Sequence, residues 1–149
     1  MNQIVHLSDG TSMAHSLDPV SLQRLMTCEL PLIKLFCAVS VKFPLYIVYG
    51  HRNEKEQNEA YAKGNSKVQW PNSKHNTYPS KAVDAVPKEQ AAGKIKLDWN
   101  DAKRFYFLAG HVMQKAKDMG IPLRFGGDWD SDTELKDNNF NDLAHYETA

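Results

Sequence analysis

Hydrophobic residues recur at helical spacing soon after a polar start to the chain. Asp18-Pro19 supplies an N-cap followed by a proline in the first turn, which predicts the start of a helix. The apolar positions of this helix are Leu22, Leu25, Met26 and Leu30. Because Pro31 has no backbone N–H to donate, we expect a break there and a second helix over residues 32–41.

Short apolar runs later in the chain have the character of strands. Leu45–Tyr49 is rich in β-branched and aromatic residues, which predicts a buried strand, and residues 82–86 predict a second one. Residues 123–125 and 144–147 predict two more strands, on either side of an acidic, glycine-containing loop at residues 126–141. These runs are sufficient for a small sheet.

The longest periodic segment, residues 100–119, predicts an amphipathic helix that covers one side of this sheet and ends at Gly120. Its inward positions are Phe105, Leu108, Val112, Ala116 and Met119. A shorter helix is expected over residues 53–63, closed by Gly64 and followed by a polar loop at residues 66–79. Helices packed mainly on one face of a small antiparallel sheet define an α+β fold.

Length and composition are those of one globular domain, residues 1–149, without internal repeats or linkers. Hydrophobic residues make up 42% and charged residues 24%, an ordinary balance for a globular protein. Lys plus Arg equals Asp plus Glu at 18 each, and the lack of a basic excess argues against a nucleic-acid partner. We expect the domain to be monomeric.

Features that would indicate export or membrane insertion are absent from the sequence. No apolar run reaches the roughly 18 residues of a membrane-spanning helix, and the start lacks the charged-then-apolar layout of a signal peptide. Cys28 and Cys37, nine residues apart, would lie on opposite sides of a continuous helix, so we expect two reduced thiols. The chain is therefore expected to be made and kept in a cytoplasm.

Polar residues near the ends of the predicted strands are not explained by packing. Asp84 lies inside the apolar run Ala-Val-Asp-Ala-Val, and a buried carboxylate is costly unless a cation or strong donors lie beside it. A catalytic zinc ion takes three His or carboxylate ligands and keeps one position for water. His75, Asp84 and His145 would supply such a set.

Each of these residues also has a simpler explanation. His75, taken singly, is a loop histidine, and His145 could be a residue at a strand edge. Asp84 could pair with an arginine such as Arg52 or Arg124. The residue chemistry alone leaves the metal site and the ion pair open.

Five segments together resemble one enzyme family over residues 17–147. The segments are Gly50–Gln57, Ser73–Asn76, Pro79–Asp84, Arg124–Asp130 and Phe140–Glu147. In order and spacing they are similar to phage endolysins of the zinc D-alanyl-D-alanine carboxypeptidase and L-alanyl-D-glutamate endopeptidase family, which has the hedgehog/D,D-peptidase-like fold. The resemblance implies that His75, Asp84 and His145 are the ligands of one zinc ion.

The resemblance also implies roles in the hydrolysis of an amide bond. Asp142 falls at the catalytic carboxylate of the family and would act as general base, while Arg52 matches an arginine that holds the substrate and the developing oxyanion. Zinc lowers the pKa of its bound water to about 7, which makes hydroxide available at neutral pH. Candidates for the substrate cleft are Ser73, His51, Gln57, Asp128 and Trp129. For Trp129 a core aromatic is the alternative.

The acidic loop Asp128–Asp132 resembles the opening of a calcium-binding loop, because its oxygen ligands alternate along the chain. The sixth position is not glycine, and Asn139 stands where a bidentate glutamate would be at the twelfth, so the support for Ca²⁺ is weak. His6, His15 and His111 are expected to be surface or packing residues.

Bacterial peptidoglycan is the substrate that the resemblance implies. Relatives cut cell-wall stem peptides between L-Ala and D-Glu or at a terminal D-Ala-D-Ala, and we favour the L-alanyl-D-glutamate endopeptidase. A zinc-containing wall-binding module, as in the hedgehog amino-terminal domain, and a tail-associated phage protein are non-enzymatic alternatives. The presence of Asp142 and Arg52 argues against a module without turnover. Without a signal peptide, an endolysin made in the host cytoplasm would need a separate membrane-permeabilising protein to reach the wall.

Overall fold

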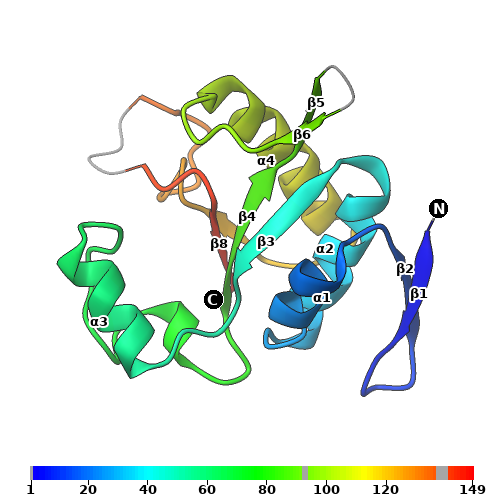
Figure 1. Ribbon diagram of the computed structural model, residues 1–149, viewed down its shortest axis with the longest axis horizontal. Helices are drawn as coiled ribbons and strands as arrows, with labels where there is room; N and C mark the ends of the chain where they lie inside the picture. Colours follow the sequence, from blue (N-terminus) through cyan, green and yellow to red (C-terminus); the bar gives the residue numbers. More distant parts are fainter. Residues whose placement is uncertain (1, 92–93, 137–140) are drawn as a thin grey trace.

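A four-stranded antiparallel sheet forms the centre of the computed structural model, which describes residues 2–91, 94–136 and 141–149 (Figure 1). The strands follow the order β3-β4-β8-β7. Their bounds are Leu45–Tyr49 (β3), Ala82–Pro87 (β4), His145–Glu147 (β8) and Arg124–Phe125 (β7). Because β4 pairs with both β3 and β8, the sheet joins the middle of the chain to its carboxyl end.

Three helices pack with this sheet around its larger hydrophobic core, and a smaller cluster contains Val86, Phe105 and Ala144. They are α1 (Pro19–Leu25), α2 (Leu30–Lys42) and α4 (Ala102–Asp118). α1 contacts β3, α4 contacts β4, and α2 contacts α4. Buried side chains of all three helices join Val83 and Tyr146 of the sheet in the core. The prediction of an α+β fold with helices mainly on one face is confirmed.

A further helix, α3 (Glu54–Ala62), lies apart from this core, beyond the end of β3 (Figure 1). Asn53 begins it through a capping box with Glu56, and Gly64, with φ of +79°, follows its end. The chain then returns to β4 through a short 3₁₀ helix, η1 (Lys74–Asn76). These segments place polar residues beside the sheet face that the core does not use.

Side-chain alternation along β4 and β8 decides which residues face away from the core. Both neighbours of Asp84 in β4 belong to the core, so the Asp84 side chain points to the opposite face of the sheet. In β8, Tyr146 belongs to the core, so His145 and Glu147 point to the same face as Asp84. The fold therefore gathers these three polar side chains on one surface of the sheet.

The first two helices are divided differently from the prediction. α1 ends at Leu25, and Leu30 begins α2 rather than ending the first helix. Pro31 lies in the first turn of α2, where a missing N–H costs no helical hydrogen bond, so it does not break a helix. The predicted Asp18 cap is confirmed, because its carboxylate accepts a hydrogen bond from the Ser21 N–H at 3.1 Å.

Two antiparallel hairpins were not predicted. One joins β1 (Gln3–His6) to β2 (Ser12–His15), and the other joins β5 (Glu89–Ala91) to β6 (Lys94–Lys96). The first hairpin packs on α2 through β2. Strands this short and this polar give little apolar periodicity, which is why the sequence pattern does not reveal them.

The remaining predicted elements are confirmed, with boundaries that move by at most two residues. The predicted inward positions of α4 are buried, except that Met119 is partly buried at the C-cap. Cys28 and Cys37 are both buried and free, as predicted. Residues 137–140 of the predicted acidic loop lie outside the described residues.

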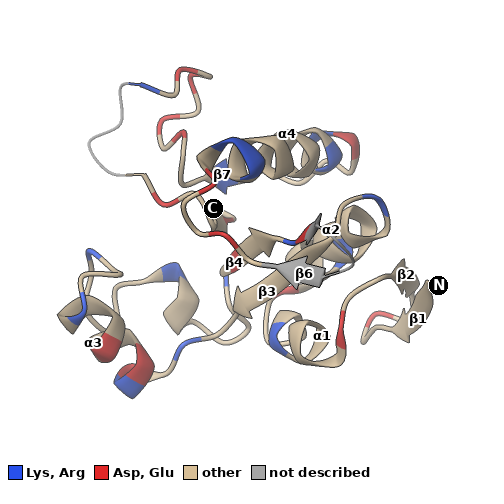
Figure 2. Ribbon diagram, turned by 45° about the horizontal axis from the view of Figure 1, so that its top comes forward, with Lys and Arg blue, Asp and Glu red and all other residues tan. Residues whose placement is uncertain are grey.

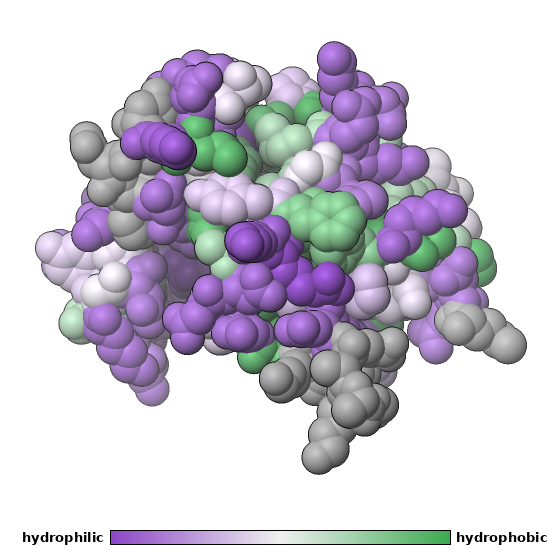
Figure 3. Space-filling model, turned by 90° about the horizontal axis from the view of Figure 1, so that it is seen from above, coloured by the Kyte–Doolittle hydropathy of each residue, from purple (hydrophilic) through white to green (hydrophobic). Residues whose placement is uncertain are grey.

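The surface reflects the balanced composition of the chain. Charges of both signs lie along α3 and α4 (Figure 2), and hydrophilic side chains cover most of the face seen in Figure 3. Within the described residues, no helix combines the length and apolar character that a membrane crossing requires.

Candidate metal centre and its cleft

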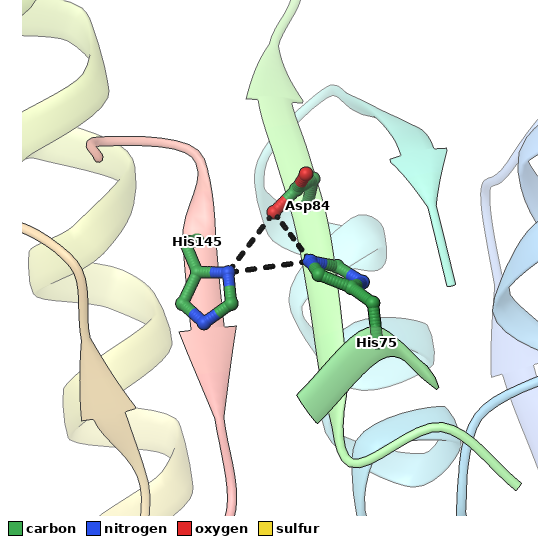
Figure 4. A group of neighbouring side chains, drawn as sticks. All are labelled: His75, Asp84 and His145. Carbon is green, nitrogen blue, oxygen red and sulfur yellow. Dashed lines mark hydrogen bonds and ion pairs between the residues drawn. The ribbon is translucent and has the colours of Figure 1, made fainter. Parts of the chain in front are cut away.

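The sheet brings two of the predicted ligands side by side. Asp84 of β4 and His145 of β8 are register partners across the antiparallel pair and share one face. His75 reaches the same point from η1, where the Ser73 hydroxyl accepts a hydrogen bond from the His75 N–H at 3.1 Å. Figure 4 shows the three side chains pointing toward one another.

The three ligand atoms lie at the separations that a small tetrahedral ion imposes. His75 Nε2 lies 3.1 Å from Asp84 Oδ1 and 3.3 Å from His145 Nδ1, and His145 Nδ1 lies 3.3 Å from Asp84 Oδ1 (Figure 4). Ligands about 2.05 Å from a tetrahedral zinc ion lie about 3.3 Å apart. The donor types and their spacing therefore fit a zinc ion held by three protein ligands.

His75 is held by the backbone at the end of β3. Its Nδ1 lies 2.7 Å from the carbonyl oxygen of Gly50, and the residue is 1% exposed. A Cβ at position 50 would overlap Thr27 Oγ1 and the Arg24 carbonyl oxygen, so only glycine fits there. Because a carbonyl oxygen only accepts, Nδ1 carries the proton and Nε2 presents its lone pair to the site.

Asp84 has an arginine on one carboxylate oxygen and the two histidines on the other. Arg52 Nη2 donates to Asp84 Oδ2 at 2.9 Å. Of the two arginines considered from the sequence, Arg52 is thus the partner, whereas Arg124 pairs with Glu147 at 2.8 Å. The ion pair and the metal site are not exclusive explanations, because each uses a different oxygen of Asp84.

Glu147, which was not predicted from the sequence, orients the third predicted ligand, His145. Its Oε1 lies 2.8 Å from His145 Nε2, and its Oε2 accepts a hydrogen bond from Arg124 Nη2 at 2.8 Å. Metal-binding histidines commonly donate their second ring N–H to a carboxylate, which orients the ring. The available signal was spacing, because residues two apart in a strand share a face.

The electrostatics of the site favour positive charge between the donors. Burial opposes ionisation of Asp84, yet the neighbouring His75 and His145 hold its pKa well below the usual range. Burial likewise opposes protonation of His145, yet hydrogen bonds to Asp84 and Glu147 raise its pKa to about 9. A cation bound between these donors would supply such charge and displace protons from them.

A cleft of about 290 Å³ opens beside His75 and His145. Its lining includes Arg52, Ser73, Lys74, Arg124, Trp129 and Asp142. A second hollow of about 450 Å³ reaches Asp84 and shares Arg52 and Asp142 with the first. The two predicted catalytic residues therefore lie where the two hollows meet at the metal centre.

Asp142 is positioned by the glycine pair that follows β7. Its N–H donates to the Gly126 carbonyl oxygen at 2.8 Å, and its own carbonyl accepts from the His145 N–H at 3.1 Å. A Cβ at position 126 would overlap the Asp142 carbonyl oxygen, so glycine is required. Burial and the negative charge of Asp84 raise the pKa of the Asp142 carboxyl, which suits a group that accepts and returns a proton near neutral pH.

Two of the five residues predicted for substrate binding, Ser73 and Trp129, line the cleft. The Trp129 ring lies 5.5 Å from the His145 ring, and the Arg124 guanidinium lies 5.3 Å from the Trp129 ring centre. Trp129 is partly exposed, so it forms part of the cleft wall rather than of the hydrophobic core.

The other three, His51, Gln57 and Asp128, lie outside the linings of both hollows. His51 Nδ1 lies 3.0 Å from the Thr77 carbonyl oxygen, and Asp128 accepts two backbone N–H groups of its own loop at 3.2 and 3.1 Å. Gln57 is fully buried and accepts a hydrogen bond from Arg52 Nη1 at 3.4 Å. Gln57 thus supports Arg52 from behind the cleft wall.

The acidic loop gathers three carboxylates into a group separate from the His-Asp-His ligands. Asp128, Asp130 and Asp132 each offer an oxygen, and these atoms lie within 4.8 Å of one another. Asn139, the twelfth position of the proposed calcium loop, lies outside the described residues. Exposed acidic groups commonly gather without an ion, so calcium binding stays a prediction.

Replacing Glu147 with Gln is expected to weaken metal binding roughly 10- to 100-fold, because a neutral amide holds the His145 N–H less strongly than a carboxylate. Competition against a chelator of known affinity measures the change. Glu59→Gln, at an exposed site on α3, is the matched control. Equal metal affinity in the two variants would show that Glu147 does not support the ligand.

An α+β domain with a His-Asp-His ligand set, and with a carboxylate and an arginine in the adjoining cleft, has the features of a metal-dependent hydrolase. A family model described as phage L-alanyl-D-glutamate peptidase matches residues 13–149. The chain belongs to this family, which confirms the resemblance inferred from the sequence motifs.

Two similar proteins carry related names. The L-alanyl-D-glutamate peptidase of Escherichia phage T5 is 35% identical over 92 residues, which are 61% of this chain and 63% of that protein. The alignment thus spans less than two-thirds of that relative. The crystal structure of the Serratia marcescens L-Ala D-Glu endopeptidase ChiX matches with a TM-score of 0.64 and 22% identity, over 87% of this chain and 86% of that chain. This likeness shows a shared fold.

Proposed function

We propose that this chain is a zinc-dependent L-alanyl-D-glutamate endopeptidase that acts on the stem peptides of bacterial cell walls. The observation that carries the proposal is the convergence of three donors within 3.1–3.3 Å of one another, in a cleft that also contains Asp142 and Arg52. Membership of the phage peptidase family and the name of the phage T5 relative support the choice of bond.

His75, Asp84 and His145 would hold the ion. A zinc ion bound there supplies Lewis acidity toward the scissile carbonyl and lowers the pKa of water to about 7. Asp142 accepts the proton of the attacking water and returns it to the amine of the leaving half. Its carboxylate is suited to this role because burial and the nearby charge of Asp84 raise its pKa above that of an ordinary aspartate, which makes it a better base.

Arg52 binds the developing negative charge on the carbonyl oxygen. Its guanidinium is held by Asp84 at 2.9 Å and lies 4.3 Å from the centre of the Tyr49 ring. Its buried Nε has no hydrogen-bond partner among the described residues. The guanidinium group is thus fixed before substrate binds, and Arg52 lines both hollows, so its positive charge is available to a transition state with little reorganisation.

The setting of the reaction follows from the same proposal. As a single-domain, monomeric phage enzyme made in the host cytoplasm, the chain would reach its substrate after a separate protein has permeabilised the membrane. Peptidoglycan is then both the substrate and the principal binding partner.

Digestion of purified peptidoglycan tests the function directly. We expect the release of new amino groups, the loss of that release with a chelator, and its return when zinc is added back. Mass spectrometry of the products is expected to show stem peptides with a new amino-terminal D-Glu. Release of D-Ala would instead identify a carboxypeptidase, and binding to the wall without new amino groups would identify a non-catalytic module.

A further inference from the structure

Among the residues that the structure describes, one partly buried basic side chain of the cleft forms no ion pair with a carboxylate. The basic side chains that line the cleft are those of Arg52, Lys67, Lys74 and Arg124. The two guanidinium groups are committed to buried carboxylates at 2.9 and 2.8 Å, and Lys67 is exposed. Lys74 is partly buried, and no carboxylate of the described residues forms an ion pair with it.

Lys74 lies where the cleft joins an adjoining hollow of about 400 Å³. Lys74, Arg124 and Glu147 line both spaces. Both oxygens of Glu147 are occupied, one by His145 and the other by Arg124, so this carboxylate does not neutralise Lys74. At this junction, the ammonium group of Lys74 has no ion pair with a described carboxylate, whereas the neighbouring Arg124 is paired with Glu147.

The backbone of Lys74 is fixed next to the metal centre. Its carbonyl oxygen accepts a hydrogen bond from the Lys81 N–H at 3.1 Å, and the following residue is the ligand His75. The Lys74 side chain therefore starts beside a predicted metal ligand and lines the cleft. Such a placement suits a group that binds the substrate close to the scissile bond.

The opposite hollow, beyond Asp84, has a different character. Apolar and aromatic residues, Val48, Tyr49 and Trp99, contribute to its lining. The basic residue in that lining is Arg52, which is committed to Asp84. The charges of the two hollows therefore favour binding of a negatively charged part of the substrate on the Lys74 side of the metal centre.

The proposed function, on which this inference rests, implies a substrate with a negative charge close to the scissile bond. A glutamyl residue has two carboxyl groups, and only one of them can continue the peptide. When its nitrogen forms the scissile amide, the leaving half carries a free carboxylate a few bonds from that nitrogen. Hydrogen bonds between ions are roughly twice as strong as those between neutral groups.

We infer that Lys74, with Arg124 beside it, binds the free carboxylate of the glutamyl residue on the leaving side. The subsite selects the acidic residue over its carboxamide. The Lys74 ammonium acts on the carboxylate as a compact point charge, and the partial burial of Lys74 limits screening by water.

Two synthetic stem peptides that differ by one group test the subsite: one has the free glutamyl carboxylate and the other has its carboxamide. The wild-type enzyme is expected to favour the acid roughly 10- to 100-fold in kcat/KM. Lys74→Met should lower kcat/KM for the acid by that factor and leave the amide almost unchanged. Lys74→Arg should keep the preference, and so should Lys115→Met, which changes an exposed lysine on α4 away from the cleft.

The ratio of the two substrates separates recognition from a structural role. Equal cleavage of both peptides by the wild type, or an equal loss on both in Lys74→Met, would overturn the subsite while the endopeptidase activity itself stands. Failure of the wild type to cut either Ala–Glu bond would reject the proposed function, and the subsite with it.

Discussion

Replacing Asp142 with Asn is expected to lower kcat about 1,000-fold while the enzyme keeps its metal and its fold. Asn preserves the shape of the side chain but cannot accept the proton of the attacking water. Asp142 is not one of the three converging ligands, so the donor set stays intact. Amino-group release from purified peptidoglycan gives the rate, and elemental analysis gives the metal content.

The control for this variant is Asp98→Asn, an exposed carboxylate outside the linings of both hollows beside the metal centre. It should retain wild-type activity. If Asp142→Asn hydrolyses the wall within a fewfold of the wild-type rate, the proposed role of Asp142 in proton transfer is wrong. If it loses its metal as well, Asp142 acts on the metal centre rather than on the proton.

Replacing Asp84 with Asn is expected to weaken metal binding and to lower the free energy of unfolding. Asp84 supplies the anionic atom of the ligand set and also balances Arg52, which is 7% exposed. Metal affinity should fall by more than the roughly 10- to 100-fold typical of outer-shell partners, and activity should disappear with the metal. Leaving a buried arginine without its partner should lower the free energy of unfolding by about 3–5 kcal/mol.

Titration with zinc and urea unfolding of the metal-free proteins separate the two effects. Asp118→Asn, at the exposed end of α4, should change neither quantity. A variant at position 84 that binds zinc with wild-type affinity would remove Asp84 from the ligand set. One that unfolds like the wild type in the absence of metal would show that the Arg52 pair contributes little.

Most of the fold could be predicted because its elements have strong local signals. β3 matches the predicted run, and the boundaries of α3 and α4 move by at most two residues, since their caps and apolar faces lie in the segments themselves. The prediction that Pro31 breaks a helix was wrong. Pro31 lies in the first turn of α2, where a proline removes no helical hydrogen bond. The hairpin of β1 and β2 was missed because its short, polar strands give little apolar periodicity.

The metal centre was predicted in part from the residues and in part from the family motifs. Asp84 was recognisable because a carboxylate inside an apolar strand needs a partner. Gln57 was expected in the cleft but is buried behind it, because its amide is used by neighbouring polar groups. No local pattern distinguishes a polar side chain that lines a cleft from one that supports its wall.

The sequence by itself determined the strongly periodic elements, the anomalous carboxylate of Asp84 and, through the order of its motifs, the family. The tertiary structure decided which polar atom meets which. Register places Asp84 opposite His145, and the His75 ring meets a residue 70 positions away. Only the folded chain shows that Glu147 is paired, whereas Lys74 has no ion pair with a carboxylate of the described residues. Hydrogen bonds and ion pairs depend on distances across the fold, whereas periodicity and caps depend on neighbours along the chain.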